Sequence, residues 1–129
     1  MTSEATRRAR RSKAKGASWE VELLNGFREQ GFNVERLTKT GKDDEGDLVL
    51  TDEWGRVVIE AKAEAKIDLP AYIREAEREA DNYVKHRGLD RQEVTAVAIV
   101  KARGKSWKEG YVVLSVAEFF DLHDEEEGK

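Results

Sequence analysis

The sequence contains no cysteine, which excludes disulfide bonds, thiol catalysis and the usual structural zinc sites. Its two histidines, His86 and His123, lie far apart and each suits a helix-end cation better than a metal ligand. No apolar run is long enough to span a bilayer and no apolar signal segment is present. We therefore expect a soluble, cytoplasmic protein without membrane partners.

Charge is abundant but unevenly distributed. The net charge is only −4, yet Glu4 is the only acid among the first fifteen residues, whose basic residues are Arg7, Arg8, Arg10, Arg11, Lys13 and Lys15. A basic arm on an acidic body favours an anionic partner, with nucleic acid first, although a solvated terminus explains it equally well. We expect a disordered arm over residues 1–15, one domain over 16–122 and an acidic tail over 123–129.

Hydrophobic periodicity predicts eight elements in the order α-β-β-β-α-β-β-α. Helices are expected over residues 17–30, 68–86 and 115–122, and strands over 32–37, 46–50, 57–62, 94–100 and 111–114. The strand over 94–100 is almost entirely apolar and β-branched, as in the middle of a sheet buried on both faces. The fold class is therefore α/β, with a mixed five-stranded sheet flanked by helices. Ser115 and Glu118 have the spacing of a capping box that opens the last helix.

Three charged residues mark the hairpin over residues 46–62. Asp47 precedes its first apolar run, and Glu60 and Lys62 close the second. Because side chains alternate along a strand, Glu60 and Lys62 point to the same face, within reach of Asp47. Two carboxylates and an amine suit a divalent metal with a positioned water. In the simpler interpretation, Asp47 is a turn residue and the other two form a solvated charge row.

A second Glu-x-Lys pair, Glu64 and Lys66, follows the first and would face the same side if the strand continued. We favour Glu60 and Lys62 because they directly follow Val57–Ile59 and lie one hairpin from Asp47.

Further motifs surround the hairpin. They are Gly16 and Glu20 at the first helix, Gly31-Phe32 and Arg36 at the first strand, Thr40-Gly41 in the next loop, and the strand-loop-Trp-strand segment over residues 97–114. Together with Asp47 and Glu60-Ala61-Lys62, they resemble the PD-(D/E)XK nuclease superfamily, and within it the archaeal-type Holliday junction resolvases and their phage-encoded relatives. The resemblance covers residues 15–122 and departs from the family where Gly46 replaces Pro and Thr40 replaces Ser.

The resemblance implies a restriction-endonuclease-like core with Glu20, Asp47, Glu60 and Lys62 as catalytic residues. Asp47, Glu60 and the Ala61 carbonyl would bind Mg²⁺, for which Mn²⁺ substitutes, and Glu20 would complete the shell directly or through water. Lys62 would orient or help deprotonate the attacking water. As an alternative, Glu20 is only a favourable charge near a helix start.

DNA contacts are expected from the basic arm, from Arg36 and Thr40, and from Lys105 in the basic loop over residues 101–108. For Arg36 and Thr40, an ordinary surface role is equally compatible with the sequence.

Three functions remain open. The first is a Mg²⁺-dependent homodimeric endonuclease that resolves four-way DNA junctions in recombination and repair. The second is a nicking or restriction-like enzyme of the same superfamily without junction preference. The third is a nucleic-acid-binding module without catalysis, which the carboxylates argue against, because acids near phosphate hinder binding unless a cation intervenes.

Overall fold

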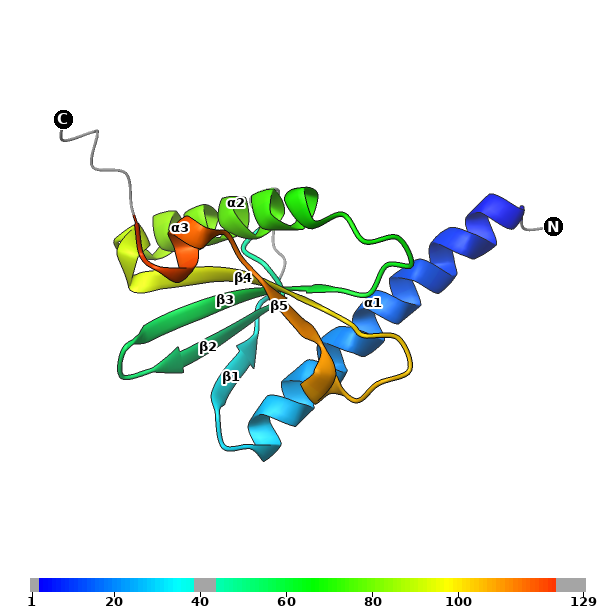
Figure 1. The fold of residues 1–129 in the computed structure, drawn as a ribbon, viewed down its shortest axis with the longest axis horizontal. Helices are drawn as coiled ribbons and strands as arrows, with labels where there is room; N and C mark the ends of the chain where they lie inside the picture. The colour runs from blue at the N-terminus through cyan, green and yellow to red at the C-terminus, as the bar shows by residue number, and fades with distance from the viewer. Residues whose placement is uncertain (1–2, 39–43, 123–129) are drawn as a thin grey trace.

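Five strands form one mixed sheet between two long helices (Figure 1). The computed structural model describes residues 3–38 and 44–122. The elements are α1 (Glu4–Glu29), β1 (Asn33–Arg36), β2 (Leu48–Asp52), β3 (Gly55–Lys62), α2 (Leu69–Arg87), β4 (Val94–Val100), β5 (Tyr111–Val113) and α3 (Val116–Phe119), with 3-10 turns η1 (Arg91–Glu93) and η2 (Trp107–Glu109). The predicted fold class and element order are confirmed. None of the described helices is long and apolar enough to cross a membrane.

The strands lie side by side in chain order, β1-β2-β3-β4-β5. All neighbours are antiparallel except β3 and β4, which run parallel. Parallel neighbours need a crossover connection, and α2 supplies it by passing over one face of the sheet. This crossover places a long helix directly above the strand that ends in Glu60 and Lys62.

The alternation along the strands divides the core into two layers. Leu48, Ile59 and their neighbours pack under α1 with Trp19 and Leu23. Val49, Val58 and their neighbours pack under α2 with residues such as Ala80. The indole Nε1 of Trp19 donates to the Ile99 carbonyl over 3.0 Å, so α1 is fixed to the central strand.

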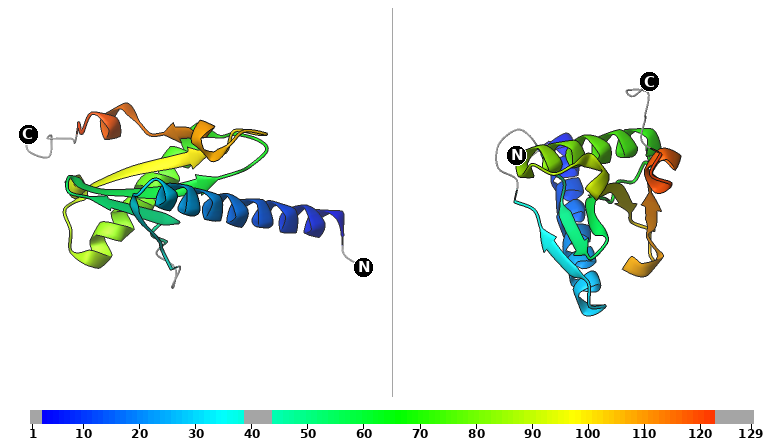
Figure 2. Two further views of the ribbon diagram at one scale, coloured as in Figure 1. Left: turned by 90° about the horizontal axis from the view of Figure 1, so that it is seen from below. Right: turned by 90° about the vertical axis from the view of Figure 1, so that its left-hand side faces the viewer.

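The first helix begins far earlier than expected. It starts at Glu4, where Ser3 caps it by accepting a hydrogen bond from the Thr6 amide over 3.1 Å. The expectation of disorder over residues 1–15 is therefore corrected for the helical residues. Low apolar content favours disorder, but Ala, Arg, Lys and Glu are strong helix formers, and the buried half of α1 provides the nucleus from which a helix propagates. Figure 2 shows this N-terminal part extending past the sheet.

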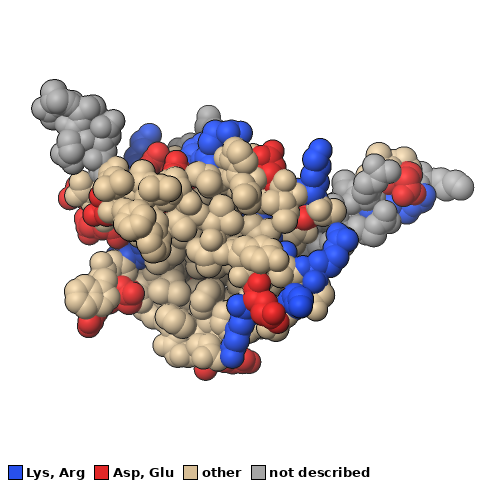
Figure 3. All heavy atoms as spheres, in the orientation of Figure 1, with Lys and Arg blue, Asp and Glu red and all other residues tan. Residues whose placement is uncertain are grey.

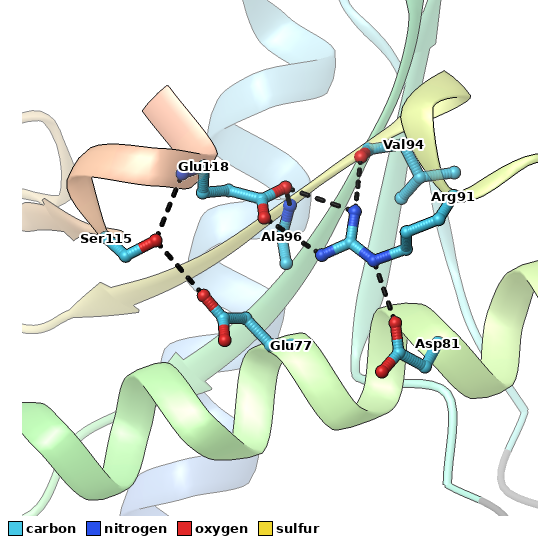
Figure 4. A network of polar contacts seen from close by, with 7 residues as sticks. All are labelled: Glu77, Asp81, Arg91, Val94, Ala96, Ser115 and Glu118. Atoms are coloured by element: carbon cyan, nitrogen blue, oxygen red, sulfur yellow. Dashed lines mark hydrogen bonds and ion pairs between the residues drawn. The ribbon is translucent and has the colours of Figure 1, made fainter. Parts of the chain in front are cut away.

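The last helix is attached through Glu118 (Figure 4). Ser115 accepts from the Glu118 amide over 3.0 Å, which is one half of the predicted capping box. The other half is wrong, because the Glu118 carboxylate binds Arg91 and the Ala96 amide. This part of β4 lies outside the pairing with β5, which begins at Ala98. Glu118 therefore satisfies an edge amide that has no strand partner there.

Candidate active site

Asp47 is held at the start of β2 by backbone atoms of β3. Its amide donates to the Ile59 carbonyl over 3.0 Å, and its Oδ2 accepts from the Ala61 amide over 2.8 Å. The hairpin register pairs Leu48 with Ile59, so Asp47 lies beside Glu60 at the same end of the sheet. The Asp47 residue is only 5% exposed. The hairpin therefore brings together Asp47, Glu60 and Ala61, as the sequence predicted.

Glu60 and Lys62 face α2. They alternate with Ile59 and Ala61, which pack in the α1 layer. The Lys62 Nζ lies 3.4 Å from Glu60 Oε2 and 2.6 Å from Glu75 Oε1. Burial opposes the charge on Lys62, but these carboxylates outweigh it and raise the pKa of the amine. Lys62 is therefore positively charged at neutral pH, which suits a role in orienting water and balancing charge better than a role as a base.

Two acids that the sequence analysis missed complete the cluster. Glu75 and Glu79 lie one turn apart on α2, and each offers a carboxylate oxygen within 4.8 Å of the others and of one from Glu60. Glu79 is fully buried. The sequence did carry a signal for it, because Glu79 lies between Ala76 and Tyr83 on the apolar face of the helix, where an acid is out of place.

The buried carboxyls of this cluster hold their protons more tightly than usual. Burial, the adjoining Glu79 and the charge of Asp47 raise the pKa of Glu60. Burial and the charges of Asp44 and Glu75 raise the pKa of Glu79 against the lowering effect of its contact with Glu60. An all-oxygen donor set of this kind fits a hard divalent cation such as Mg²⁺, which would offset the mutual repulsion.

Glu20 and Arg36 form an ion pair with each other. Arg36 shares a strand face with Val34, which belongs to the α1 layer. Glu20 is therefore paired on the α1 side and lies outside the group formed by Glu60, Glu75 and Glu79. Its predicted metal role and the phosphate role of Arg36 stay predictions. Thr40 lies outside the described residues.

The second Glu-x-Lys pair lies beyond the strand. β3 ends at Lys62, and Glu64 is exposed, with Oε1 accepting from the Tyr72 hydroxyl over 2.8 Å. Glu60 and Lys62 therefore lie within β3 and Glu64 and Lys66 do not, which agrees with the reason for preferring the first pair.

The other residues predicted to contact DNA belong to α1 and to the loop that follows β4. In α1, Arg10 is exposed and Arg7 is paired with Glu4 over 2.9 Å, whereas the side chains of Arg8, Arg11, Lys13 and Lys15 lie outside the described part of the chain. Lys105 is exposed after β4. The same loop borders a hollow of about 670 Å³ that is lined by Ser18, Glu64, Lys101, Arg103 and Tyr111, among others.

Comparison with known proteins places the chain in a family. The family model of the archaeal Holliday junction resolvase (Hjc) matches residues 11–128. Among solved structures, Hjc from Archaeoglobus fulgidus, a Holliday junction resolvase from an archaeal hyperthermophile, is 20% identical over 70% of this chain and 71% of that chain, with a TM-score of 0.48. No curated protein matches. Because the family model spans most of the sequence, this chain belongs to the archaeal Holliday junction resolvase family.

Proposed function

We propose that this protein is a Mg²⁺-dependent endonuclease that resolves four-way DNA junctions by hydrolysing phosphodiester bonds. Family membership makes the chain a nuclease, and the metal and the junction specificity are the proposed part. The observation that carries the proposal is the grouping of Asp47, Glu60 and Lys62 at one end of the β2–β3 hairpin. Carboxylates and an ammonium group in this arrangement suit metal-assisted phosphodiester hydrolysis.

The roles of the residues follow from their chemistry. A bound divalent cation stabilises charge on the phosphate and lowers the pKa of a coordinated water. Asp47, Glu60 and the Ala61 carbonyl would hold that cation, and Mn²⁺ is expected to substitute for Mg²⁺. The charged Lys62 would orient the water that attacks phosphorus as the opposite P–O bond breaks.

DNA binding is assigned to residues outside the Asp47, Glu60 and Lys62 motif. We assign phosphate contacts to Arg36, Thr40, Lys105 and the basic part of α1. Because Glu20 holds Arg36, the two are best tested together: Glu20 either contributes to the metal shell or orients Arg36.

Two paired incisions require two active sites, so we propose a symmetric homodimer. Its surface is expected on β5 and α3, where Tyr111, Val112, Phe119, Phe120 and Leu122 are exposed. Figure 3 shows mostly uncharged atoms over this face, with Lys and Arg gathered toward the side from which α1 extends. An exposed apolar patch beside an open sheet edge is a favourable association surface. Light scattering on the purified chain would give twice the monomer mass.

The test of function is cleavage of labelled four-way junction, flap and linear duplex in Mg²⁺. Paired nicks confined to the junction are expected. Equal cleavage of all three substrates would instead favour a superfamily nuclease without junction preference. Salt-sensitive binding with no products at all would favour a module without catalysis.

Variants test the site itself. Asp47→Asn and Glu60→Gln are expected to abolish cleavage and leave junction binding largely intact, since each removes a carboxylate from the reacting centre. Glu64→Gln is the matched control, because it changes the exposed acid of the second Glu-x-Lys pair. Wild-type cleavage by the Asp47→Asn, Glu60→Gln double variant, or a strong loss in Glu64→Gln, would show that the site is wrongly assigned.

A further inference from the structure

Helix α2 carries a buried acid, Glu79, on the face that packs against the sheet, where an apolar residue is expected. The buried residues of α2 are Tyr72, Ala76, Glu79, Ala80, Tyr83 and Val84. Glu79 is 0% exposed. Burying a carboxylate without a partner is strongly unfavourable, because the group loses its hydration. Such a residue needs a compensating positive group.

The described part of the chain does not provide one. The buried atoms Glu60 Oε1, Glu79 Oε1 and Glu79 Oε2 have no hydrogen-bond partner among the described residues. The adjacent amine of Lys62 is engaged by Glu75 and Glu60. Three oxygens of the two adjoining buried carboxyl groups are therefore left without a donor from the other described residues.

The spacing of these oxygens matches a cation shell. One oxygen each from Glu60, Glu75 and Glu79 lies within 4.8 Å of the other two. Oxygen ligands lie about 2.0–2.6 Å from Mg²⁺ or Ca²⁺, so ligands of one ion are separated by up to about 5 Å. The cluster thus has the dimensions of a site for a divalent cation.

The loop before Asp47 passes next to Glu79. Gly46 has a φ of +102°, which Pro cannot adopt, and a Cβ there would lie 3.5 Å from Glu79 Oε1 and 3.0 Å from Val58 Cγ1. The positive φ and the tight approach of Val58 therefore favour Gly at this position, and the backbone leading to Asp47 lies in contact range of Glu79. The α2 acid adjoins the motif rather than forming a separate site.

We propose that Glu79 and Glu75 of α2 form a divalent-cation site with Glu60 of β3, in which Glu79 is a ligand outside the Asp47, Glu60 and Lys62 motif. The inference rests on the proposed function only in sharing Glu60, and it is independent of the DNA that is cut.

The direct test is binding of Mn²⁺ to the full chain without DNA, followed by electron paramagnetic resonance and calorimetry. Glu79→Gln keeps the size of the side chain and removes its charge, so we expect Mn²⁺ affinity to fall by about tenfold or more. Glu77→Gln is the control on the same helix, because Gln can still accept from the Ser115 hydroxyl, which lies 3.2 Å from Glu77 Oε2. Wild-type Mn²⁺ affinity in Glu79→Gln would overturn the proposal.

Thermal unfolding separates loss of a ligand from damage to the fold. In EDTA, Glu79→Gln should unfold at the same temperature as the wild type or higher, because an acid crowded by Glu60 and Glu75 is replaced by a neutral amide of the same size. Added Mn²⁺ should raise the unfolding temperature of the wild type more than that of the variant. A lower temperature for the variant in EDTA, together with equal Mn²⁺ shifts, would overturn the proposal.

Failure of the two proposals gives different results. A wild-type chain that binds Mn²⁺ through Glu79 yet cuts no junction would overturn the proposed function alone. A chain that cuts junctions while Glu79→Gln binds Mn²⁺ normally would overturn the α2 site alone.

Discussion

Glu45 joins the loop before Asp47 to the last turn of α2. Its Oε2 accepts from Arg87 Nη1 over 2.7 Å and contacts His86 Nδ1. Asn82 also donates to the Asp44 carbonyl over 2.8 Å. These contacts fix the backbone that leads to Asp47, the residue that we propose to be catalytic.

The pH dependence of this attachment has a definite sign. Burial acts to raise the pKa of Glu45, but hydrogen bonds from Arg87 and His86 outweigh it and lower the pKa below the ordinary 4.5. As pH falls, the unfolded chain therefore binds the proton first, so the stabilisation is present above pH 4.5 and is lost as the pH falls through the folded-state pKa.

We predict that Glu45→Gln lowers the free energy of unfolding by roughly 0.5–1 kcal/mol at neutral pH. The difference from the wild type should shrink in acid. Thermal unfolding followed by circular dichroism at about pH 7 and about pH 3 measures this, on either side of the carboxyl pKa. Glu53→Gln, at an exposed position in the β2–β3 turn, is the control. A constant difference at both pH values would contradict the prediction.

At the scale of elements, Glu118 connects α3 to the edge of the sheet (Figure 4). Its carboxylate accepts from Arg91 Nη2 over 2.9 Å and from the Ala96 amide over 2.8 Å. Arg91 also binds Asp81 on α2 through Nε over 2.9 Å. Burial opposes the charge on Arg91, but Glu118 and Asp81 raise its pKa, so the guanidinium stays charged. Glu118 of α3 thus connects that helix to η1 and β4.

We predict that Glu118→Ala lowers the free energy of unfolding by about 2–3 kcal/mol, because it leaves a partly buried guanidinium and an edge amide without this partner. Urea unfolding measures the change. Glu109→Ala, an exposed acid in η2, is the matched control and should change stability little. A loss equal to that of the control would mean that Glu118 contributes no net stabilisation.

At the scale of the whole molecule, charge is separated in space. The basic half of α1 extends past the sheet (Figures 1 and 2). The carboxylates of Glu60, Glu75 and Glu79 meet between β3 and α2. A projecting cationic helix extends the reach of the molecule along an anionic polymer, since each neutralised phosphate releases counterions. We propose that this separation lets the protein attract DNA while it keeps an acidic centre.

We predict that replacing the arm cations with Gln weakens DNA binding and reduces its salt dependence. The residues to change are Arg7, Arg8, Arg10, Arg11, Lys13 and Lys15. The slope of log K against log salt should become shallower by about 0.9 for each phosphate that the variant no longer neutralises. Fluorescence anisotropy over a salt series measures this, and Gln preserves helix propensity. An unchanged slope would show that the arm does not bind phosphate.

Local sequence patterns predicted much of the fold. The element order and the hairpin with Asp47, Glu60 and Lys62 were predictable, because strand alternation and turn residues depend on near neighbours in the chain. The helical arm was not predicted, because a segment with few apolar residues has no hydrophobic pattern that indicates a helix. Its residues nevertheless favour a helix, and the buried half of α1 provides the nucleus from which that helix propagates. The role of Ser115 at α3 was also predicted, but the partners of Glu118 were not.

The sequence by itself determined the hairpin, its three charged groups and the family, since each depends on residues close together or on a motif order. Only the tertiary structure decided that Glu75 and Glu79 meet Glu60, and that Glu118 binds Arg91 and the edge of β4. These contacts join residues that are remote in the chain, and their geometry is set by how α2 and α3 dock on the sheet. Docking arises from the packing of many apolar side chains at once, so no single local pattern specifies it.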